Sequence, residues 1–391
     1  MQGQKLLQSI RLKGILSYGS RGADLDLEPL NVLIGPNASG KSNLIEAISL
    51  LAAAPRNLLK PFWDGGGVSE WLWKGDRRKD LAEVEAVLSF PSLRYRLAFT
   101  AIDGRFHLRE EVLENDCGEE PFSYYAFRNG KAVIKFQDPA TQDRMELDLQ
   151  RGDLDLEQSI LSQRKDRTAY SELTTVGERF GQIRFYRKWN FGLGSAIREL
   201  QRTDLPSDFL LEDGSNLALV LNDLQNRPLT KKLLLEKLKL FYERVEDFTT
   251  GVLGGTIQVF LHEKGLDNPV PASRLSDGTL RYLCLLAILC HPQPPPLICI
   301  EEPELGLHFD ALRTVAELLV DAALKTQLIV TTHSDVLVSA LSNVPECVVV
   351  CERGDDGTEL RRLEPAKLQE WLDGRQLGDL WAMGQIGGTR W

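Results

Sequence analysis

The chain has few cysteines, and none of them is spaced for metal binding. Its 391 residues include six cysteines, and no two of them form a Cys-x-x-Cys pair. Zinc sites and disulfide frameworks both need cysteines at close, regular spacing, so neither is expected. Cys284, Cys290 and Cys299 lie in apolar runs, where a free thiol packs as a small hydrophobic side chain.

Long apolar runs and an excess of positive charge are also missing. No run approaches the roughly 20 residues that span a bilayer, and the first residues, MQGQKLLQSIRLKG, lack the apolar core of a signal peptide. A cytoplasmic protein that does not associate with a membrane is therefore expected. The net charge of −10 argues against a chain built throughout to wrap nucleic acid. Three short basic clusters remain candidates for a local groove, although such clusters are more often solvated faces: 77–79, 164–167 and 231–232.

Composition and periodicity predict a folded N-terminal part rich in strands. Hydrophobic residues make up 43% of the chain and charged residues 26%, which is enough apolar material for a core. Residues 5–34 are typical of two or three strands, and a helix is expected from Lys41 to about Ala54. Residues 55–80 predict an ordered loop. Residues 81–150 alternate polar and apolar side chains in the manner of antiparallel strands.

The rest of the chain differs in its periodicity. Residues 152–250 are expected to be mainly helical, and the clearest helix, Leu229–Tyr242, keeps a heptad pattern for only about two repeats, too short for a coiled-coil arm. After Gly254 and Gly255 strands and helices alternate. The runs LICI, QLIVTT and VVVC there are typical of buried strands in a parallel sheet. The predicted parts are residues 1–150, 151–250 and 251–391.

The strongest motif is a glycine-rich loop, GPNASGKS, between an apolar strand and a helix. This is the context of a phosphate-binding loop. Glycines let backbone N–H groups converge on phosphate oxygens, and the helix N-terminus adds positive potential. We therefore expect Lys41 to reach the β- and γ-phosphates and the Ser42 hydroxyl to hold Mg²⁺. The predicted ATP-binding residues of the loop are Gly35, Pro36, Asn37, Ala38, Ser39, Gly40, Lys41, Ser42 and Asn43.

A second motif, LICIEEPELGLH, places two acids at the end of an apolar strand. The carboxyl edge of a sheet is where a phosphate loop also lies, so both acids are expected beside it. We expect Glu301 to bind the Mg²⁺ shell and Glu302 to orient and deprotonate the attacking water. A general base of this kind contributes about 10²–10⁴-fold in rate. The alternative is a pair of exposed acids that end a strand.

A third strand, QLIVTT, is followed directly by His333. A lone histidine is usually structural, but this one is expected at the strand tip, where it would donate to the γ-phosphate. The predicted catalytic residues are thus Lys41, Glu302 and His333. Asp153 and Asp155 form an Asp-x-Asp pair of the kind that holds metal in nucleases. No partner glutamate is evident for that pair, and a solvated face is the simpler interpretation.

These motifs, in this order, resemble a known superfamily. GPNASGKSNLIEAI, LSDGT, ICIEEPELGLH and VTTHSD are similar to the ATP-binding cassette ATPases of the SMC, RecF and OLD type. The likeness is greatest to stand-alone RecF-like ATPases, loosely labelled AAA-family ATPases and often linked with phage defence. It implies ATP hydrolysis with Mg²⁺ and an α/β fold. That fold would be an ATPase head with a mixed sheet around the phosphate loop, an antiparallel β lobe, and a helical insertion lobe in place of a coiled-coil arm.

The resemblance also gives a role to the turn LSDGT, which precedes an apolar helix. In this superfamily such a Ser-x-Gly turn closes over the γ-phosphate that a second subunit binds. It therefore assigns Ser276 and the Gly278 N–H to ATP binding, and implies a homodimer that forms on ATP binding and loosens on hydrolysis. Ser276 can also be a helix N-cap.

Three departures from the superfamily pattern are visible. Glu301 stands where most relatives have Asp, and Asp277 and Thr279 replace the Gly and Gln of transporter-type signatures. The glutamine that normally contacts Mg²⁺ has no clear anchor between the first two motifs. Gln158 is our choice for this ligand over Gln163.

Three functions stay open at this point. The protein can be an ATP-gated dimer that switches a partner effector in defence, a RecF-like DNA-binding ATPase of repair and recombination, or a binding platform with minimal turnover. OLD-type nucleases carry a TOPRIM domain after the ATPase, but only 58 residues follow His333. A TOPRIM-type nuclease is therefore expected on another chain. The tail GGTRW is either a docking peptide or a strand end packed on the core.

Overall fold

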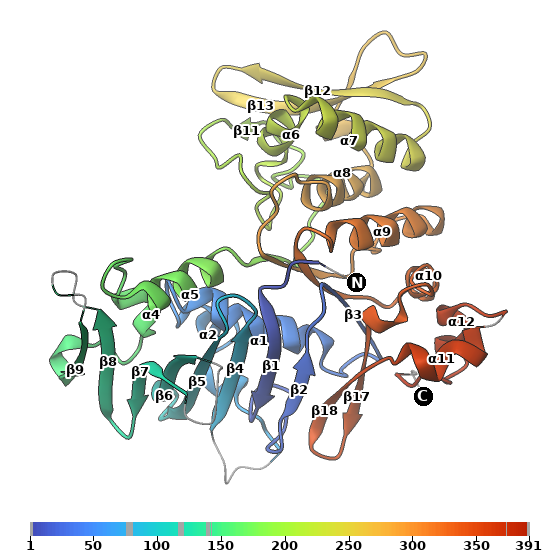
Figure 1. Cartoon of the computed structure of the whole chain (residues 1–391). Coiled ribbons are helices and arrows are strands. Elements are labelled where there is room, and N and C mark those ends of the chain that lie inside the picture. Colours follow the sequence, from blue (N-terminus) through green and yellow to red (C-terminus); the bar gives the residue numbers. More distant parts are fainter. Residues whose placement is uncertain are drawn as a thin grey trace. The chain divides into compact units, whose positions relative to one another are not determined.

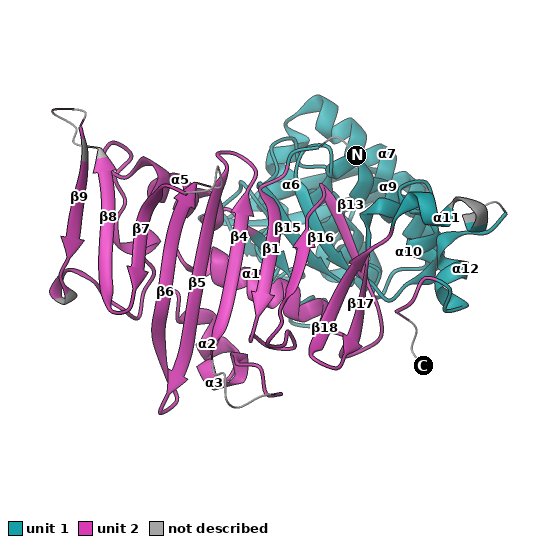
Figure 2. Ribbon diagram, turned by 60° about the horizontal axis from the view of Figure 1, so that its bottom comes forward, with its two compact units in different colours: residues 1–4, 184–348, 364–385 teal, residues 5–183, 349–363, 386–391 magenta. Residues whose placement is uncertain are grey.

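The chain folds into two compact units, each assembled from separated stretches (Figure 2). The computed structural model describes residues 3–75, 81–115, 121–137, 141, 143–372 and 374–388. Unit 1 comprises residues 1–4, 184–348 and 364–385, and unit 2 comprises residues 5–183, 349–363 and 386–391. The predicted boundaries at residues 150 and 250 do not coincide with these units, because segments far apart in sequence fold together.

A large antiparallel sheet dominates unit 2 (Figure 1). Its strand order is β2-β1-β4-β5-β6-β7-β8-β9, and every neighbouring pair is antiparallel. Alternate side chains of β4 and β5 are buried, which confirms the alternation predicted over residues 81–150. The strands are β1 (Leu7–Lys13), β2 (Ala23–Asp26), β4 (Ala82–Leu88), β5 (Leu93–Ile102), β6 (Arg105–Asn115), β7 (Ser123–Arg128), β8 (Lys131–Gln137) and β9 (Arg144–Leu149).

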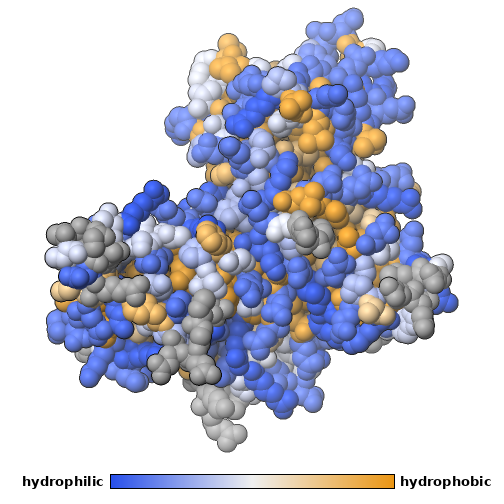
Figure 3. All heavy atoms as spheres, in the orientation of Figure 1, coloured by the Kyte–Doolittle hydropathy of each residue, from blue (hydrophilic) through white to orange (hydrophobic). Residues whose placement is uncertain are grey.

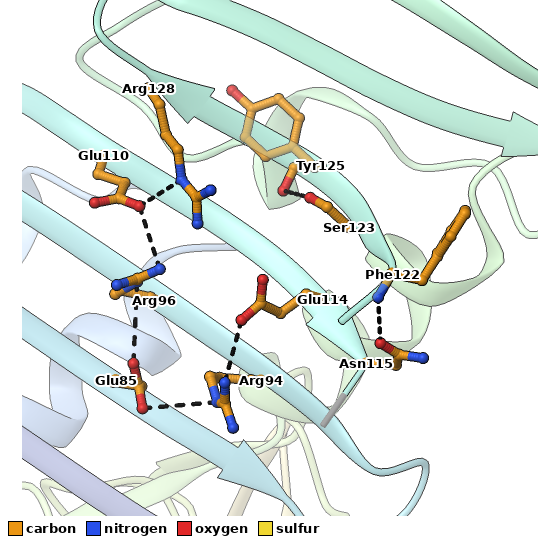
Figure 4. A network of polar contacts seen from close by, with 10 residues as sticks. All are labelled: Glu85, Arg94, Arg96, Glu110, Glu114, Asn115, Phe122, Ser123, Tyr125 and Arg128. Atoms are coloured by element: carbon orange, nitrogen blue, oxygen red, sulfur yellow. Dashed lines mark hydrogen bonds and ion pairs between the residues drawn. The ribbon is translucent and has the colours of Figure 1, made fainter. Parts of the chain in front are cut away.

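One face of this sheet carries a cross-strand charge ladder (Figure 4). Arg94 on β5 pairs with Glu114 on β6 at 3.3 Å, and Arg128 on β7 pairs with Glu110 at 2.7 Å. Such partly exposed pairs contribute roughly 0.2–1 kcal/mol each. The ladder consists of Glu85, Arg94, Arg96, Glu110, Glu114 and Arg128.

Unit 2 also holds the predicted phosphate loop. Every residue of strand β3 (Leu30–Ile34) is buried, and helix α1 (Lys41–Ala53) follows the loop as predicted. Its apolar residues Leu44, Ile45 and Ile48 are buried. The ordered loop expected over residues 55–80 contains two short helices. The remaining elements are α2 (Lys60–Asp64), α3 (Val68–Trp71), η1 (Arg151–Asp153), α4 (Ile160–Gln163), α5 (Ser171–Gly181), and the antiparallel hairpin β17 (Val348–Gly354) and β18 (Gly357–Arg362).

Unit 1 contains the other predicted motif strands. β10 (Arg184–Tyr186), β15 (Leu297–Glu301) and β16 (Gln327–Thr331) pair in parallel, as the LICI and QLIVTT runs predicted. The third run, VVVC, lies in β17, which neighbours β3 in its sheet and pairs with β18 in an antiparallel hairpin. Helices of the same unit are α8 (Asp277–Leu289), α9 (Phe309–Ala322), α10 (Asp335–Ser339), α11 (Pro365–Leu372) and α12 (Leu377–Ala382), with short η2 (Ala272–Arg274) and η3 (Pro345–Cys347).

The rest of unit 1 packs two helices on a small antiparallel sheet. The helix predicted at Leu229–Tyr242 is confirmed as α7 (Pro228–Phe241), which lies beside α6 (Leu217–Gln225). The expectation that residues 152–250 are mainly helical is met only in part, because β10 and β11 fall in this range and β12 begins in it. The sheet strands are β11 (Gln201–Arg202), β12 (Val245–Leu253), β13 (Thr256–Glu263) and β14 (Val270–Pro271).

The described part of the chain has no coiled-coil arm, and its longest helices, α7 and α9, have 14 residues each. None of its helices combines the length and the apolar character that crossing a membrane requires. The face drawn in Figure 3 is mostly hydrophilic, with apolar side chains interspersed among polar ones.

Candidate active site

Two glycines shape the phosphate loop of unit 2. Gly35 follows the last residue of β3 with φ 146°, and Gly40 caps the start of α1 with φ 97°. A Cβ added at Gly40 would lie 2.1 Å from the Thr358 hydroxyl, and one added at Gly35 would lie 2.2 Å from the Cys351 carbonyl oxygen. Both the positive φ and the close approach of neighbouring atoms therefore require glycine at these positions.

The hydrogen-bond donors around this loop could bind the phosphates of a nucleoside triphosphate. Lys41 is buried, and its Nζ donates to the carbonyl oxygens of Gly35 at 2.8 Å and Pro36 at 2.9 Å. The Ser39 hydroxyl is buried without a hydrogen-bond partner in the described part of the chain. Ser42 is exposed in the first turn of α1. An ammonium, an unpaired hydroxyl and the amides of a helix N-terminus form an anion-binding set.

Three hydroxyl groups pack against the main chain of the phosphate loop. They belong to Ser17, Tyr18 and Thr358, and we call them the hydroxyl clasp. The Tyr18 hydroxyl donates to the Gly40 carbonyl oxygen at 3.1 Å, and the Thr358 hydroxyl donates to the Ser39 carbonyl oxygen at 2.9 Å. Thr358 also contacts the Ser17 hydroxyl at 2.7 Å. Sequence reasoning missed these residues, because no local pattern links Thr358 to a loop more than three hundred positions earlier.

In unit 1, the two acids of the second motif lie in a strained turn. Glu301 ends β15, and Glu302 adopts φ 46°. The Glu302 amide donates to the Thr331 carbonyl oxygen at 3.0 Å, and its carbonyl oxygen accepts from Arg281 Nη1 at 3.0 Å. The Trp189 indole donates to the Glu301 carbonyl oxygen at 3.0 Å. A non-glycine residue at positive φ costs about 1–3 kcal/mol, so these bonds hold Glu302 in an unfavourable conformation.

The predicted base and the predicted histidine come together in this unit. His333 Nε2 lies 3.7 Å from Glu302 Oε1. The Glu304 side chain supports this pair, because its Oε1 accepts from the Thr332 hydroxyl at 2.7 Å and from the His333 amide at 2.8 Å. Burial raises the pKa of Glu304. Glu304 lies two residues after Glu302 in the motif EEPE, and this proximity could have identified it from the sequence.

Arg281 is a second residue that the sequence reasoning missed. Its guanidinium is buried 5.0 Å from the Trp189 ring and 5.2 Å from the Phe191 ring, and burial lowers its pKa. Because it also donates to the Glu302 carbonyl oxygen, it ties helix α8 to the acidic turn. The available signal was a single basic residue in a helix whose following residues are almost all apolar.

The Ser-x-Gly turn lies at the start of α8. Ser276 is exposed and is the N-cap of this helix, since its Oγ accepts from the Thr279 amide at 3.0 Å. The N-cap role considered from the sequence is thus present. A Cβ at Gly278 would lie 3.0 Å from the Gly306 carbonyl oxygen, so this turn packs closely on the turn that follows the two acids.

The structure does not bring Gln158 to Ser42. The Gln158 amide accepts from Leu58 N at 3.0 Å and donates to Asn57 Oδ1 at 3.4 Å, beyond the last residue of α1. Ser42 lies at the other end of this 13-residue helix, which is about 20 Å long. Gln158 is therefore not placed to share a magnesium ion with Ser42. In the described part of the chain, Gln163 bonds to backbone carbonyls and an amide of its own segment.

The Asp-x-Asp pair behaves as a local structural feature. Asp153 accepts from the Gln150 amide at 2.9 Å, and Asp155 accepts from the Glu157 amide at 2.9 Å. Across the described ranges, no group of three or more His, Cys, Asp or Glu side chains is arranged to hold a metal ion.

Comparison with solved structures shows the fold. A crystal structure of an Smc head bound to the C-winged helix domain of ScpA matches with a TM-score of 0.56 at 14% identity, covering 93% of this chain and 99% of that one. An Smc head from Pyrococcus furiosus, with an extended coiled coil and the C-terminal domain of ScpA, matches with a TM-score of 0.55 at 13% identity, covering 94% and 99%. The mixed α/β fold is thus that of SMC-type ATPase heads.

Comparison with protein families shows the relationship of the chain. No curated protein matches it. Residues 30–339 match the family described as "AAA domain, putative AbiEii toxin, Type IV TA system". This match includes the phosphate loop, the Ser-x-Gly turn, the two acids and His333. The chain therefore belongs to this family of AAA-domain proteins, and it is an ATPase with the fold of SMC heads.

Proposed function

We propose that this ATPase is a molecular switch that works as an ATP-sandwiched dimer. The observation that carries the proposal is the exposed Ser276 turn. It begins helix α8, as anion-binding turns do, and it packs closely on the turn that contains Gly306. Two copies arranged head to tail would each offer a phosphate loop to the Ser276 turn of the other. ATP would favour this closed dimer, and hydrolysis would loosen it.

Within each ATP site, the residues of one chain have distinct tasks. Lys41 and the amides around Ser39 bind the β- and γ-phosphates. Ser42 and Glu301 would hold Mg²⁺, which supplies charge neutralisation when it is bound. Glu302 orients the attacking water and takes its proton, and His333, next to Glu302, donates to the γ-phosphate.

The switch is proposed to act on a separate effector protein, with a TOPRIM-type nuclease as the first candidate and anti-phage defence as the setting. Smc heads of this fold were solved bound to domains of ScpA, so the fold accommodates partner binding in those proteins. A dimer that opens and closes with ATP offers two distinct surfaces to such a partner.

The alternative function, a RecF-like DNA-binding ATPase of repair and recombination, receives less support from the described charges. The arginines of the charge ladder face glutamates, which lowers the positive potential of that sheet face. In the candidate basic clusters, Arg167 pairs with Glu178 at 2.7 Å and Lys231 with Asp247 at 3.0 Å. The cluster at residues 77–79 lies outside the described residues, as does the end of the GGTRW tail.

The shared ATP site can be tested by mixing two inactive variants. Lys41→Ala removes the phosphate-loop ammonium, and Ser276→Ala removes the proposed donor from the opposite subunit. Each variant alone should lose more than about tenfold in ATP turnover. In a 1:1 mixture, each dimer that pairs the two variants would have one intact site. ATPase activity should therefore rise clearly above the sum of the two variants, up to the quarter of the wild-type rate that random pairing would give.

A matched control uses two changes within the same subunit's site. Lys41→Ala mixed with Glu302→Gln leaves no intact site in any dimer, so this mixture should stay inactive. If the Lys41→Ala and Ser276→Ala mixture only gives the sum of its components, the head-to-tail dimer is contradicted.

A further inference from the structure

Arg198 is a nearly buried arginine in unit 1 that the proposed chemistry does not use. It lies in the loop after β10, and its side chain is only 10% exposed to solvent. A buried guanidinium is costly unless every donor finds an acceptor. Its partners therefore indicate what it does.

Those partners surround the Ser276 turn. Arg198 Nη1 donates to the Leu275 carbonyl oxygen at 2.7 Å and to the Ser273 carbonyl oxygen at 3.4 Å. Arg198 Nη2 pairs with the Asp277 carboxylate. The main chain just before Ser276 and the side chain just after it are thus held by one guanidinium.

The other end of the same side chain is anchored in the aromatic segment near the two acids. Arg198 Nε donates to the Phe191 carbonyl oxygen at 2.6 Å. The Phe191 ring stacks on Trp189 at 5.8 Å between centroids, and Trp189 bonds to Glu301. Arg198 therefore joins the Ser276 turn to the scaffold that also supports the acidic turn.

We propose that Arg198 is a positioning residue that fixes the Ser276 turn in the shape that presents the Ser276 hydroxyl and the Gly278 amide outward. This rests on the proposed function, in which Ser276 acts on ATP held by a second copy. The planar fork of arginine reaches several acceptors at once, whereas a lysine ammonium on a flexible stem does not. Asp277 stands where transporter-type signatures have Gly. Its pairing with Arg198 gives a physical reason for this difference, because a glycine would leave Arg198 Nη2 without its carboxylate partner.

The test compares Arg198→Lys, Ser276→Ala and the double variant. Arg198→Lys should lower kcat more than about tenfold, while binding of a fluorescent ATP analogue at the phosphate loop stays within about twofold. The losses of the two single variants should not add in the double variant, because both changes remove the contact of the Ser276 hydroxyl with ATP. Hydrogen exchange of the segment 273–280 should speed up in Arg198→Lys. Arg202→Lys is the matched control, since Arg202 is exposed on the next strand and pairs with Asp204. It should match the wild type in every assay.

The outcomes separate this inference from the function on which it rests. Unchanged exchange over 273–280 in Arg198→Lys, or losses that add in the double variant, would overturn the positioning role. A wild-type kcat for Ser276→Ala, with faster exchange in Arg198→Lys, would instead overturn the catalytic role of Ser276 and leave Arg198 as the residue that shapes the turn.

Discussion

At the scale of single residues, the site depends on backbone conformations that most side chains disfavour. Ala38 in the phosphate loop and Glu302 after β15 both adopt positive φ, at 63° and 46°. Neither is a glycine, so the surrounding hydrogen bonds must hold them there. Arg281 and Thr331 do this for Glu302. These bonds fix the main chain of Glu302 before substrate binds, which helps to place the side chain of the proposed general base.

Gly40→Ala should weaken ATP binding. The new methyl group would overlap the Thr358 and Ser17 hydroxyls at 2.1 and 2.5 Å, so the hydroxyl clasp and the loop cannot both keep their places. We expect at least a tenfold weaker affinity for a fluorescent ATP analogue, together with about 1–3 kcal/mol lower unfolding free energy in urea.

Gly104→Ala is the control for this change. Gly104 also has positive φ, at 74°, but an added Cβ would meet no atom within 4 Å. It should lose stability from backbone strain alone and bind the ATP analogue normally. Equal loss of binding in both variants would contradict the steric explanation.

At the scale of elements, a buried carboxylate joins the antiparallel sheet to a short helix. Glu111 on β6 is fully buried and accepts from the Ile160 amide at 3.0 Å, at the start of α4. The Tyr95 hydroxyl donates to it at 2.7 Å, and Ser159 donates as well. Burial is the largest influence on this group and raises its pKa above the ordinary 4.5, although these bonds oppose the rise. The helix is thus attached to the sheet through one acid.

Glu111→Gln should destabilise the protein, because an amide NH₂ would face donors in place of an acceptor oxygen. We expect a loss of about 1–3 kcal/mol in urea unfolding. Since the folded pKa is raised, the wild-type contribution is complete below pH 4.5 and declines as pH rises through the folded pKa. The variant has no carboxyl group to titrate at this position. The difference in unfolding free energy between wild type and variant should therefore shrink as pH is raised.

Glu146→Gln provides the comparison, because Glu146 is an exposed residue on β9 paired with Lys135. It should change stability by less than about 0.5 kcal/mol without this pH trend. A deficit for Glu111→Gln that grows with pH would contradict the raised pKa.

At the scale of the whole molecule, the site residues are divided between two units. The phosphate loop belongs to unit 2, whereas both acids, His333 and Ser276 belong to unit 1. Each unit is built from separated stretches of chain, so neither corresponds to a continuous segment that could be removed intact. Nucleotide-dependent assembly is therefore best examined on the full chain.

Glu302→Gln should trap the closed dimer. If Glu302 is the general base as proposed, this variant should bind Mg-ATP but hydrolyse it about 10²–10⁴-fold more slowly. Light scattering should show a doubled mass with Mg-ATP and a return to the lower mass when EDTA removes the metal. The Lys41→Ala protein lacks the phosphate contact, so its mass should not double under any of these conditions. A Glu302→Gln protein that keeps its lower mass with Mg-ATP would contradict the dimer.

The sequence by itself determined the parts of the site whose signals are local. Gly35, Gly40 and Lys41 fall within eight consecutive residues, and a phosphate loop needs little more than that stretch with a strand before it and a helix after it. Glu302 directly follows β15 and His333 lies two residues after β16, which is why both were predictable at the ends of apolar strands. Period-two alternation likewise predicted the antiparallel strands over residues 81–150.

Only the tertiary structure decided how distant segments support these motifs. Thr358 behind the phosphate loop, Arg198 beside the Ser276 turn and the placement of Gln158 beyond the far end of α1 leave no local pattern in the chain. A single hydrogen bond between segments far apart depends on how whole elements pack, and not on the residue types around either partner. The same reason explains why each unit combines separated stretches, since strands return to a unit after the chain has built part of the other.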